Sequence, residues 1–239
     1  MRQFLELLST ASQLPKELYF EFIIFPSQKS FLKPLFIGNY SNALKILKPF
    51  IEIASSVDLK NYSSYDEVLK VAGKHVPAVS SQPEVMRACV LKEMSKDVAR
   101  IFFEIEVPDS CRISFDQFGG AVNERAPNET AYHHRNASFD YYASCLYSNT
   151  SELAEVGQFE DDLFNSLVQG GHCVGGYIND VDPKVKDWQH FYYGDNYERL
   201  VEIKQVWNTI RSGTLHFRHE IGSNYQPNGS LLLWKHSLL

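Results

Sequence analysis

The sequence CRISFDQF at residues 111–118 opens a run of short, β-rich stretches with turns between them. The run continues with TAYHH at 130–134, SFDYYASCLY at 138–147 and HCVGGYIN at 172–179. Stretches of this kind, bounded by turn residues, are typical of strands. A helix predicted over about 151–169 separates the last two and ends at Gly170-Gly171, a suitable C-cap. Because strands and helices alternate without the regular rhythm of a Rossmann domain, we predict an α+β fold in which helices cover an antiparallel β-sheet.

Several further elements are predicted on either side of this run. Apolar spacing indicates helices over 2–13, over 42–54 with Ser41 as the cap, over Ser64–Val71 with Glu67 completing a capping box, over 84–99 and over 195–207. Strands are predicted over 17–26 and 31–37, and Pro34 favours an edge position or a bulge in the second. Residues 75–83 are predicted to form a loop. The run IFFEIEV at 101–107 is strand-like, but it also fits a continuation of the preceding helix.

Composition excludes several classes of protein. The 239 residues carry a net charge of −6 and are 44% hydrophobic, which is the profile of a globular protein. An acidic balance argues against nucleic-acid binding, which needs clustered Lys and Arg. No apolar run approaches the length of a membrane span. The first residues lack the cationic and uninterrupted apolar regions of a signal peptide and read as an amphipathic helix. The apolar tail LLLWKHSLL needs a partner surface.

The cysteines and the glycosylation sequons bear on the cellular compartment. None of the four cysteines is paired as C-x-x-C, so we expect buried free thiols, with one or two disulfides as the alternative. Acceptor sequons occur at Asn39, Asn61, Asn128, Asn136, Asn149 and Asn228. They predict a secreted glycoprotein lineage, the alternative being a Ser- and Asn-rich composition without glycans. A secretory history without a signal peptide leads us to expect that the N-terminus of the parent protein is absent.

Common catalytic and phosphate-binding motifs are missing from the sequence. There is no Walker A loop, no G-x-G-x-x-G, no G-x-S-x-G and no H-E-x-x-H. His133 and His134 are adjacent, and neighbouring residues on a strand point to opposite faces, so we expect no shared metal ion. A structural or substrate-lining role is the better prediction for both.

Three stretches, in order, resemble a known family. Phe118-Gly119-Gly120-Ala121-Val122, Ala126-Pro127 and Thr130–Arg135 resemble the G-G-x-x…P…A-[FY]-x-H-R segment of berberine-bridge-enzyme-like FAD-linked oxidases. Tyr177-Ile178-Asn179 with Asp182 and Trp188 resembles the Y-x-N…D…W segment of that family. Residues 191–204 resemble its Y-[YW]-G-x-N-x-x-R-L-x-x-I-K element. The resemblance is strong over about 115–207 and weaker over 1–114.

The resemblance implies an FAD-dependent oxidoreductase. Such enzymes have an N-terminal flavin domain, a substrate domain built on an antiparallel sheet and a chain that finally returns to the flavin domain. They oxidise alcohols or C–H donors among carbohydrates and secondary metabolites by hydride transfer to FAD, and O2 reoxidises the flavin. By this resemblance residues 1–172 form the substrate domain and residues 173–239 the berberine-bridge-like C-terminal segment. The flavin domain is missing from this chain, so we expect little turnover from it alone and a separate flavin domain as a partner.

The resemblance also assigns roles to residues. The tyrosine that serves many relatives as base is replaced by Asp180, which predicts either a carboxylate base or a turn residue. Asp140 falls near an active-site carboxylate of relatives, and Tyr142 lies on the same strand face, where ordinary sheet packing is the alternative. Tyr177, Asn179, Tyr193, Gly194 and Asn196 are expected on the cofactor side. Phe118, His133 and His134 are expected to line the substrate.

The end of the family pattern is imperfectly kept, because the Asp-Pro that follows Lys204 in relatives is replaced here by Trp207-Asn208-Thr209. Two departures at active-site positions favour a second hypothesis of another class. Phe118 stands where some relatives have an active-site tyrosine, and its ring cannot transfer a proton. Together with Asp180 in place of tyrosine, it leaves open a non-catalytic remnant that binds a ligand or a partner. Ligand binding without flavin would distinguish this module from an enzyme.

Overall fold

The computed structural model describes residues 6–9, 14–26, 30–72 and 82–210. Within these ranges six strands form one sheet in the order β2-β1-β4-β5-β3-β6, and every pairing in it is antiparallel. The strands are β1 (Leu18–Ile24), β2 (Ser30–Phe36), β3 (Glu84–Leu91), β4 (Cys111–Gln117), β5 (Phe139–Leu146) and β6 (Cys173–Gly175). The predicted α+β fold with an antiparallel sheet is therefore confirmed.

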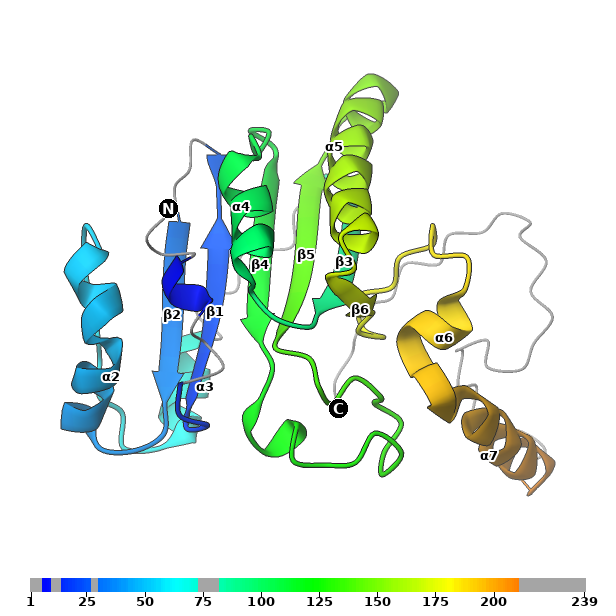
Figure 1. Cartoon of the computed structure of the whole chain (residues 1–239), viewed down its shortest axis with the longest axis horizontal. Helices are drawn as coiled ribbons and strands as arrows, with labels where there is room; N and C mark the ends of the chain where they lie inside the picture. Colours follow the sequence, from blue (N-terminus) through cyan, green and yellow to red (C-terminus); the bar gives the residue numbers. More distant parts are fainter. Residues whose placement is uncertain (1–5, 10–13, 27–29, 73–81, 211–239) are drawn as a thin grey trace.

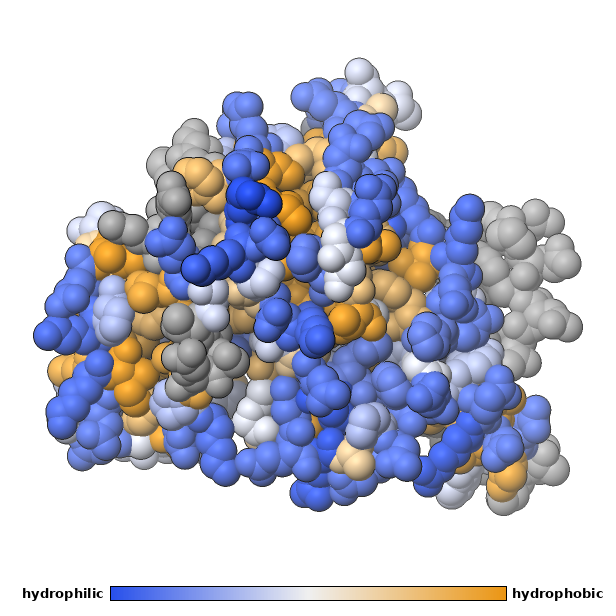
Figure 2. Space-filling view, in the orientation of Figure 1, coloured by the Kyte–Doolittle hydropathy of each residue, from blue (hydrophilic) through white to orange (hydrophobic). Residues whose placement is uncertain are grey.

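Helices cover one face of this sheet, and further helices lie beyond its two edges. The helices are α2 (Tyr40–Ile53), α3 (Tyr65–Ala72), α4 (Lys96–Glu104), α5 (Thr150–Gln169), α6 (Trp188–Tyr193) and α7 (Tyr197–Ile210), with short 3-10 turns at Gly120–Val122 and Gly194–Asn196. Figure 1 shows α4 and α5 in front of the sheet, α2 beside β2, and α6 and α7 beyond β6. The helices that cover this face present mainly hydrophilic residues outward, and hydrophobic residues show between them (Figure 2).

The core lies between the sheet and these helices. Alternate residues of three adjacent strands point into it, among them Phe22, Phe115 and Tyr141, each fully buried. Phe102 of α4 packs edge-on against Phe115, with ring centroids 4.6 Å apart. Since alternate strand residues face opposite ways, the residues between these core positions form a second face of the sheet that α4 and α5 leave uncovered.

The prediction over residues 84–107 was wrong in its element types. Residues 84–91 form strand β3, and residues 101–104 of the strand-like run 101–107 belong to α4, as the alternative interpretation allowed. Strand β3 is an inner strand whose last four residues are all buried, so its apolar residues form a run without alternation. A short run of this kind does not distinguish helix from strand by periodicity. The helix begins only after Ser95, whose hydroxyl accepts a hydrogen bond from the amide of Val98 at 3.2 Å.

Other predicted elements hold with small corrections. Helix α2 is capped by Asn39 and not by Ser41, because the Asn39 side-chain oxygen accepts from the Ser41 amide at 2.8 Å. Pro34 lies in the edge strand β2, as expected. Residues 130–134 form no strand. Residues 6–8 are helical, while the rest of the predicted 2–13 helix, most of the 75–83 loop and the apolar tail lie outside the described residues.

The expected free thiols are also corrected. The structure pairs Cys111 with Cys145 and Cys89 with Cys173, so the prediction of free thiols was wrong and the alternative of two disulfides holds. Cys111 and Cys145 are direct partners across β4 and β5, with Cα atoms 4.0 Å apart. Sequence alone could not show this register, because it depends on how β4 and β5 are aligned.

Candidate active site

The uncovered face of the sheet carries a polar row across three neighbouring strands. Asp116 of β4 lies directly opposite Asp140 of β5 and also pairs in register with Glu21 of β1. Ser114 lies opposite Tyr142 one step along the same two strands. Tyr142 is therefore on the same face as Asp140, as the alternation of a strand predicted. This face therefore brings carboxyl and hydroxyl groups together, whereas the core-facing residues of the same strands are apolar.

Asp140 and Asp180 form the centre of this row. Asp140 is 2% exposed, and the carboxyl group of Asp180 lies within hydrogen-bonding reach of its side chain. Burial raises the pKa of Asp140 well above that of an ordinary carboxyl group, and the bond to Asp180 and the negative charges of Asp180 and Asp116 raise it further. Burial also raises the pKa of Asp180, while the hydrogen bond from Asp140 lowers it. These opposite effects of the hydrogen bond favour a single proton on the pair, held mainly by Asp140.

The same centre includes an unsatisfied polar atom. The Oδ1 atom of Asp140 is buried and has no hydrogen-bond partner in the structure. Buried polar atoms are paired in the great majority of cases, and exceptions need an explanation such as a ligand or a catalytic role. An acceptor or donor on a bound substrate would satisfy this atom.

Tyr19 extends the row to the next strand. Its hydroxyl donates to the Oδ1 atom of Asp116 at 2.7 Å. Burial raises the pKa of Asp116, although this hydrogen bond opposes the rise. Burial and the bond to Asp116 also raise the pKa of Tyr19, so its hydroxyl keeps its proton at neutral pH. Neither residue was predicted from sequence, because the position of each depends on the register between strands.

Three aromatic rings border the carboxyl pair. Phe118, Tyr132 and Tyr177 contact one another edge-on, with ring centroids 5.9 to 6.2 Å apart. The Tyr132 hydroxyl is buried without a partner, and burial together with the charge of Asp140 raises its pKa. Asn179 donates from its side-chain nitrogen to the Tyr177 hydroxyl at 2.6 Å. The structure thus brings Phe118, Tyr177 and Asn179 to the same place as Asp140 and Asp180.

The remaining predicted site residues join the C-terminal segment to the loop before β5. The ring of His134 bonds through Nε2 to the carbonyl of Phe191 at 2.9 Å, so Nε2 carries the proton. Burial lowers the pKa of His134, which favours this neutral form. His133 lies against Gly194, where an added Cβ atom would be 2.4 Å from the ring. Asn196 donates to the carbonyls of Pro127 at 2.7 Å and Thr130 at 3.1 Å.

These contacts show how four of the predicted residues are held, and their expected cofactor and substrate roles stay predictions. Tyr193 is buried against Trp188 and Tyr197, at centroid distances of 6.5 Å and 6.2 Å. Gly194 has φ of +49°, a left-handed conformation that favours glycine. The histidine pair and Asn196 thus fix the position of the segment that carries Tyr177 and Asp180.

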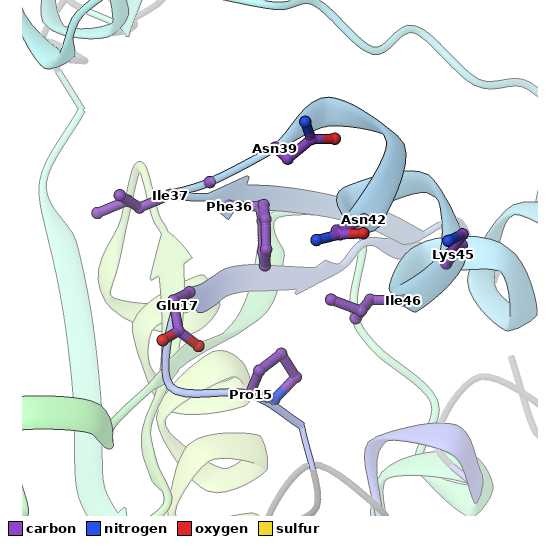
Figure 3. A pocket seen from close by; sticks show the side chains of 9 residues that line it. Pro15, Glu17, Phe36, Ile37, Asn39, Asn42, Lys45 and Ile46 are labelled. Atoms are coloured by element: carbon purple, nitrogen blue, oxygen red, sulfur yellow. The ribbon is translucent and has the colours of Figure 1, made fainter.

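A separate pocket opens at the far edge of the sheet. It lies between the end of β2 and the first turn of α2, and its lining includes Phe36, Ile37, Asn42, Lys45 and Ile46 (Figure 3). None of the predicted site residues lines it. It is therefore distinct from the carboxyl row, although its lining also includes the carboxyl group of Glu17.

Comparisons with known proteins agree with this geometry. A family model described as "Berberine and berberine like" matches residues 176–210, the segment that carries Asp180 and Asn196. The uncharacterized FAD-linked oxidoreductase YgaK of Bacillus subtilis (strain 168) is 23% identical over 180 residues, which are 72% of this chain and 39% of that protein. In this segment and in its fold the chain is similar to the berberine-bridge-enzyme-like FAD-linked oxidases.

Solved structures of this family share the fold. Wild-type BBE-like 1 of Physcomitrella patens superposes with a TM-score of 0.73 at 17% identity, over 87% of this chain and 48% of that chain. Phl p 4, a grass pollen allergen with glucose dehydrogenase activity, has a TM-score of 0.67 at 15% identity, over 86% of this chain and 48% of that chain. The chain spans about half the length of these berberine-bridge-like proteins or less.

Two classes of feature are not found in the part of the chain that the structure describes. No group of three or more His, Cys, Asp or Glu side chains there is arranged to hold a metal ion. No helix within the described ranges is both long and apolar enough to cross a membrane.

Proposed function

We propose that this chain forms the substrate side of an FAD-dependent oxidoreductase that oxidises an alcohol or C–H donor, a carbohydrate or a secondary metabolite. The observation that carries the proposal is the buried carboxyl group of Asp140, which lies opposite Asp116 and beside Asp180 and has one oxygen without a partner. Two electrons leave such a donor as hydride, and FAD supplies the acceptor when it is bound. Reoxidation by O2 completes the proposed cycle.

The described residues fit one side of the flavin better than the other. Two buried polar atoms have no partner, Asp140 Oδ1 on the uncovered face and Tyr132 Oη in the neighbouring loop, and a ring system and a substrate would meet them. Phosphate groups bind glycine-rich loops at helix N-termini, and the sequence has no such motif. We therefore propose that Tyr177, Asn179, Tyr193, Gly194 and Asn196 belong to the flavin-facing side, while a separate flavin domain holds the phosphates.

The carboxyl pair would accept the proton that the donor loses. Oxidation of an alcohol to a carbonyl breaks one C–H bond, whose hydride goes to the flavin, and one O–H bond, whose proton needs a base. Asp180 is the ionised member of the pair and takes that proton, while Asp140 stays protonated and holds Asp180 in place by their hydrogen bond. Tyr142 and the ring of Phe118 would border the donor, and His133 and His134 would line the rest of its site.

Substitution of the pair tests this role. In a protein that combines this chain with its flavin domain and bound FAD, Asp180→Asn removes the base, and we expect flavin reduction by a donor to slow by about 10²–10⁴-fold. Because the pKa of Asp180 is raised, wild-type reduction should weaken as pH falls at a higher pH than an ordinary carboxyl group would give. Tyr40→Phe, an exposed residue at the start of α2, is the matched control and should leave the rate unchanged. A folded, flavin-loaded Asp180→Asn variant with wild-type reduction rates would sink the proposed role.

Flavin retention tests the division of the site between domains. After incubation with FAD and desalting, we expect the purified chain to show protein absorbance only, with little turnover. Retained flavin bands together with oxidase activity would contradict this expectation. Binding of a sugar or an aromatic alcohol without flavin would instead favour the non-catalytic binding remnant.

We also propose that the protein passes through a secretory pathway and carries N-glycans. The five sequon asparagines within the described ranges are exposed: Asn39, Asn61, Asn128, Asn136 and Asn149. Asn39 caps α2 through its oxygen, which leaves the nitrogen free for a glycan. Paired cysteines are typical of oxidising compartments. Removal of N-glycans with an endoglycosidase should lower the apparent mass of protein made in a eukaryotic host, and an unchanged mass would contradict the proposal.

A further inference from the structure

The loop that carries Asp180 is anchored by a buried ion pair at its neighbour Asp182. Arg87 of β3 donates from Nε to the Oδ2 atom of Asp182 at 2.7 Å and from Nη1 to the Oδ1 atom of Asp161 at 2.8 Å. Its guanidinium lies 3.7 Å above the ring centroid of Phe164 in α5. Arg87 and Asp182 are 6% and 3% exposed. Both members of this pair are therefore desolvated and held in one geometry.

Asp182 is fixed at three further points. Its other carboxylate oxygen accepts from the backbone amide of Lys184 at 2.8 Å. Its own amide donates to the hydroxyl of Tyr192 at 2.7 Å. Its carbonyl accepts from the amide of Val185 at 3.2 Å. These bonds place Asp182 relative to the sheet through Arg87 and relative to the C-terminal segment through Tyr192.

The chain changes sides of the sheet between Asp180 and Asp182. Arg87 is the register partner of Ala143, a buried core residue, so the ion pair lies on the face that α5 covers. Asp180 bonds to Asp140, which lies between core residues 139 and 141 and therefore points to the uncovered face. Two residues reach at most about 7 Å. Fixing Asp182 on one side thus limits where Asp180 can lie on the other.

We propose that Arg87 is a positioning residue, whose ion pair with Asp182 holds Asp180 against Asp140. A buried ion pair is weak evidence for stability, because its desolvation offsets much of its attraction. The better-supported use of such a pair is to specify one geometry. The functional meaning of this inference rests on the proposed proton-accepting role of Asp140 and Asp180, while the positioning itself does not.

Other charged groups surround both parts of this arrangement. Lys184 donates to the same Asp161 that Arg87 contacts, at 2.8 and 2.9 Å, and Glu160 lies beside them on α5. Asp116 of β4 and Tyr132 of the preceding loop are the groups that interact with Asp140 besides Asp180. Asp161 and Lys184 thus also tie the loop to α5, but the side chain of neither bonds to the Asp182 carboxylate as the guanidinium of Arg87 does.

Titration of the two carboxyl groups tests the proposal without any flavin. In the whole chain, 13C chemical shifts of the Asp140 and Asp180 carboxyl carbons should titrate in two coupled steps. In Arg87→Met we expect independent single steps, with a lower pKa for Asp140 because the hydrogen bond and charge of Asp180 are lost. Arg87→Lys keeps the charge but reaches only one of its two carboxylates, so coupling should be partly restored. Leu163→Ala, in the core-facing side of α5, destabilises the same helix and should leave the coupling intact.

Two outcomes would overturn the inference. One is a folded Arg87→Met variant whose carboxyl groups still titrate as a coupled pair. The other is loss of coupling in Leu163→Ala to the same extent, which would show that any destabilisation of α5 releases Asp180. If Arg87→Met does not fold, Asp182→Asn, which keeps the shape of the side chain but removes its charge, answers the same question. Failure here would leave the proton-accepting role untouched, whereas unchanged flavin reduction in Asp180→Asn would remove that role and leave the positioning intact.

Discussion

At the scale of single residues, the neutral state of Asp140 is explained by its surroundings. Desolvation disfavours the charge of a carboxylate, and two further carboxyl groups lie beside it. The protonated group stays in place because Asp180 accepts its hydrogen bond. Sites that handle protons commonly use this kind of pair, in which environment separates the two protonation states.

Glu160 is a second buried carboxyl group, on the other side of the sheet. It is fully buried in α5, both of its carboxylate oxygens lack partners, and burial raises its pKa from 4.5 to about 8. The folded state therefore binds the proton more tightly than the unfolded state does. Its contribution to stability is fully present below pH 4.5 and is lost as pH rises toward about 8.

This linkage gives a prediction for Glu160→Gln. Between pH 5 and pH 8 the free energy of unfolding should fall more in the wild type than in the variant, by on the order of 1–3 kcal/mol. Urea unfolding at the two pH values measures the difference. Asp162→Asn, an exposed carboxyl group two residues further along α5, serves as the control and should keep the wild-type pH dependence. Equal pH dependence in wild type and Glu160→Gln would contradict a neutral Glu160.

Sequence analysis found the central residues of the candidate site but not their setting. Asp140, Asp180, Tyr177 and Asn179 were found because the family resemblance covers the segments that carry them. Arg87 was missed because the stretch 84–99 was predicted to be helical, and its side chain meets the loop only through the sheet. Asp116 and Tyr19 were missed because their positions depend on strand register, which no local pattern specifies.

At the scale of elements, local sequence succeeded where one face of an element is buried. The strands β1, β4 and β5 and the helices α2 and α5 have apolar positions with the expected period, and their bounds lie within a few residues of the predictions. The prediction for strand β3 failed because the strand lies between two others and consecutive residues in it are buried, so its apolar residues show no period of two. The strand expected at residues 130–134 does not form. His134 and Arg135 are buried there, but they bond to the carbonyls of Phe191 and Val122 and not to a neighbouring strand.

Two glycines in different elements give opposite predictions. Gly194→Ala places a Cβ atom against the ring of His133 in a left-handed conformation, and should cost about 1–3 kcal/mol of unfolding free energy. Gly157→Ala, in the middle of α5 with nothing near its added Cβ atom, should stabilise by about 0.5–1 kcal/mol. Thermal unfolding of both variants measures the two signs. A neutral Gly194→Ala would show that the turn before α7 tolerates a side chain and does not fix the C-terminal segment.

At the scale of the whole molecule, the apolar core and the candidate site lie on opposite faces of the sheet. The helix-covered face of the sheet holds the apolar core, while the uncovered face holds the carboxyl row. The C-terminal segment is tied to this fold on both faces, through Arg87 and Asp182 on one and through Asp140 and Asp180 on the other. The carboxyl pair therefore forms only when the segment after β6 packs in this position against strands β3 and β5.

The central claim is that Asp140 and Asp180 act as one group that shares a proton, and infrared spectroscopy of the whole chain tests it directly. At neutral pH we predict one carboxylic-acid C=O band that disappears in Asp140→Asn and shifts in Asp180→Asn, alongside a second band that disappears in Glu160→Gln. Spectra in which neither Asp140→Asn nor Asp180→Asn changes any carboxylic-acid band would mean that both carboxyl groups are ionised at neutral pH. That result would contradict the shared proton, and with it the role proposed for the pair.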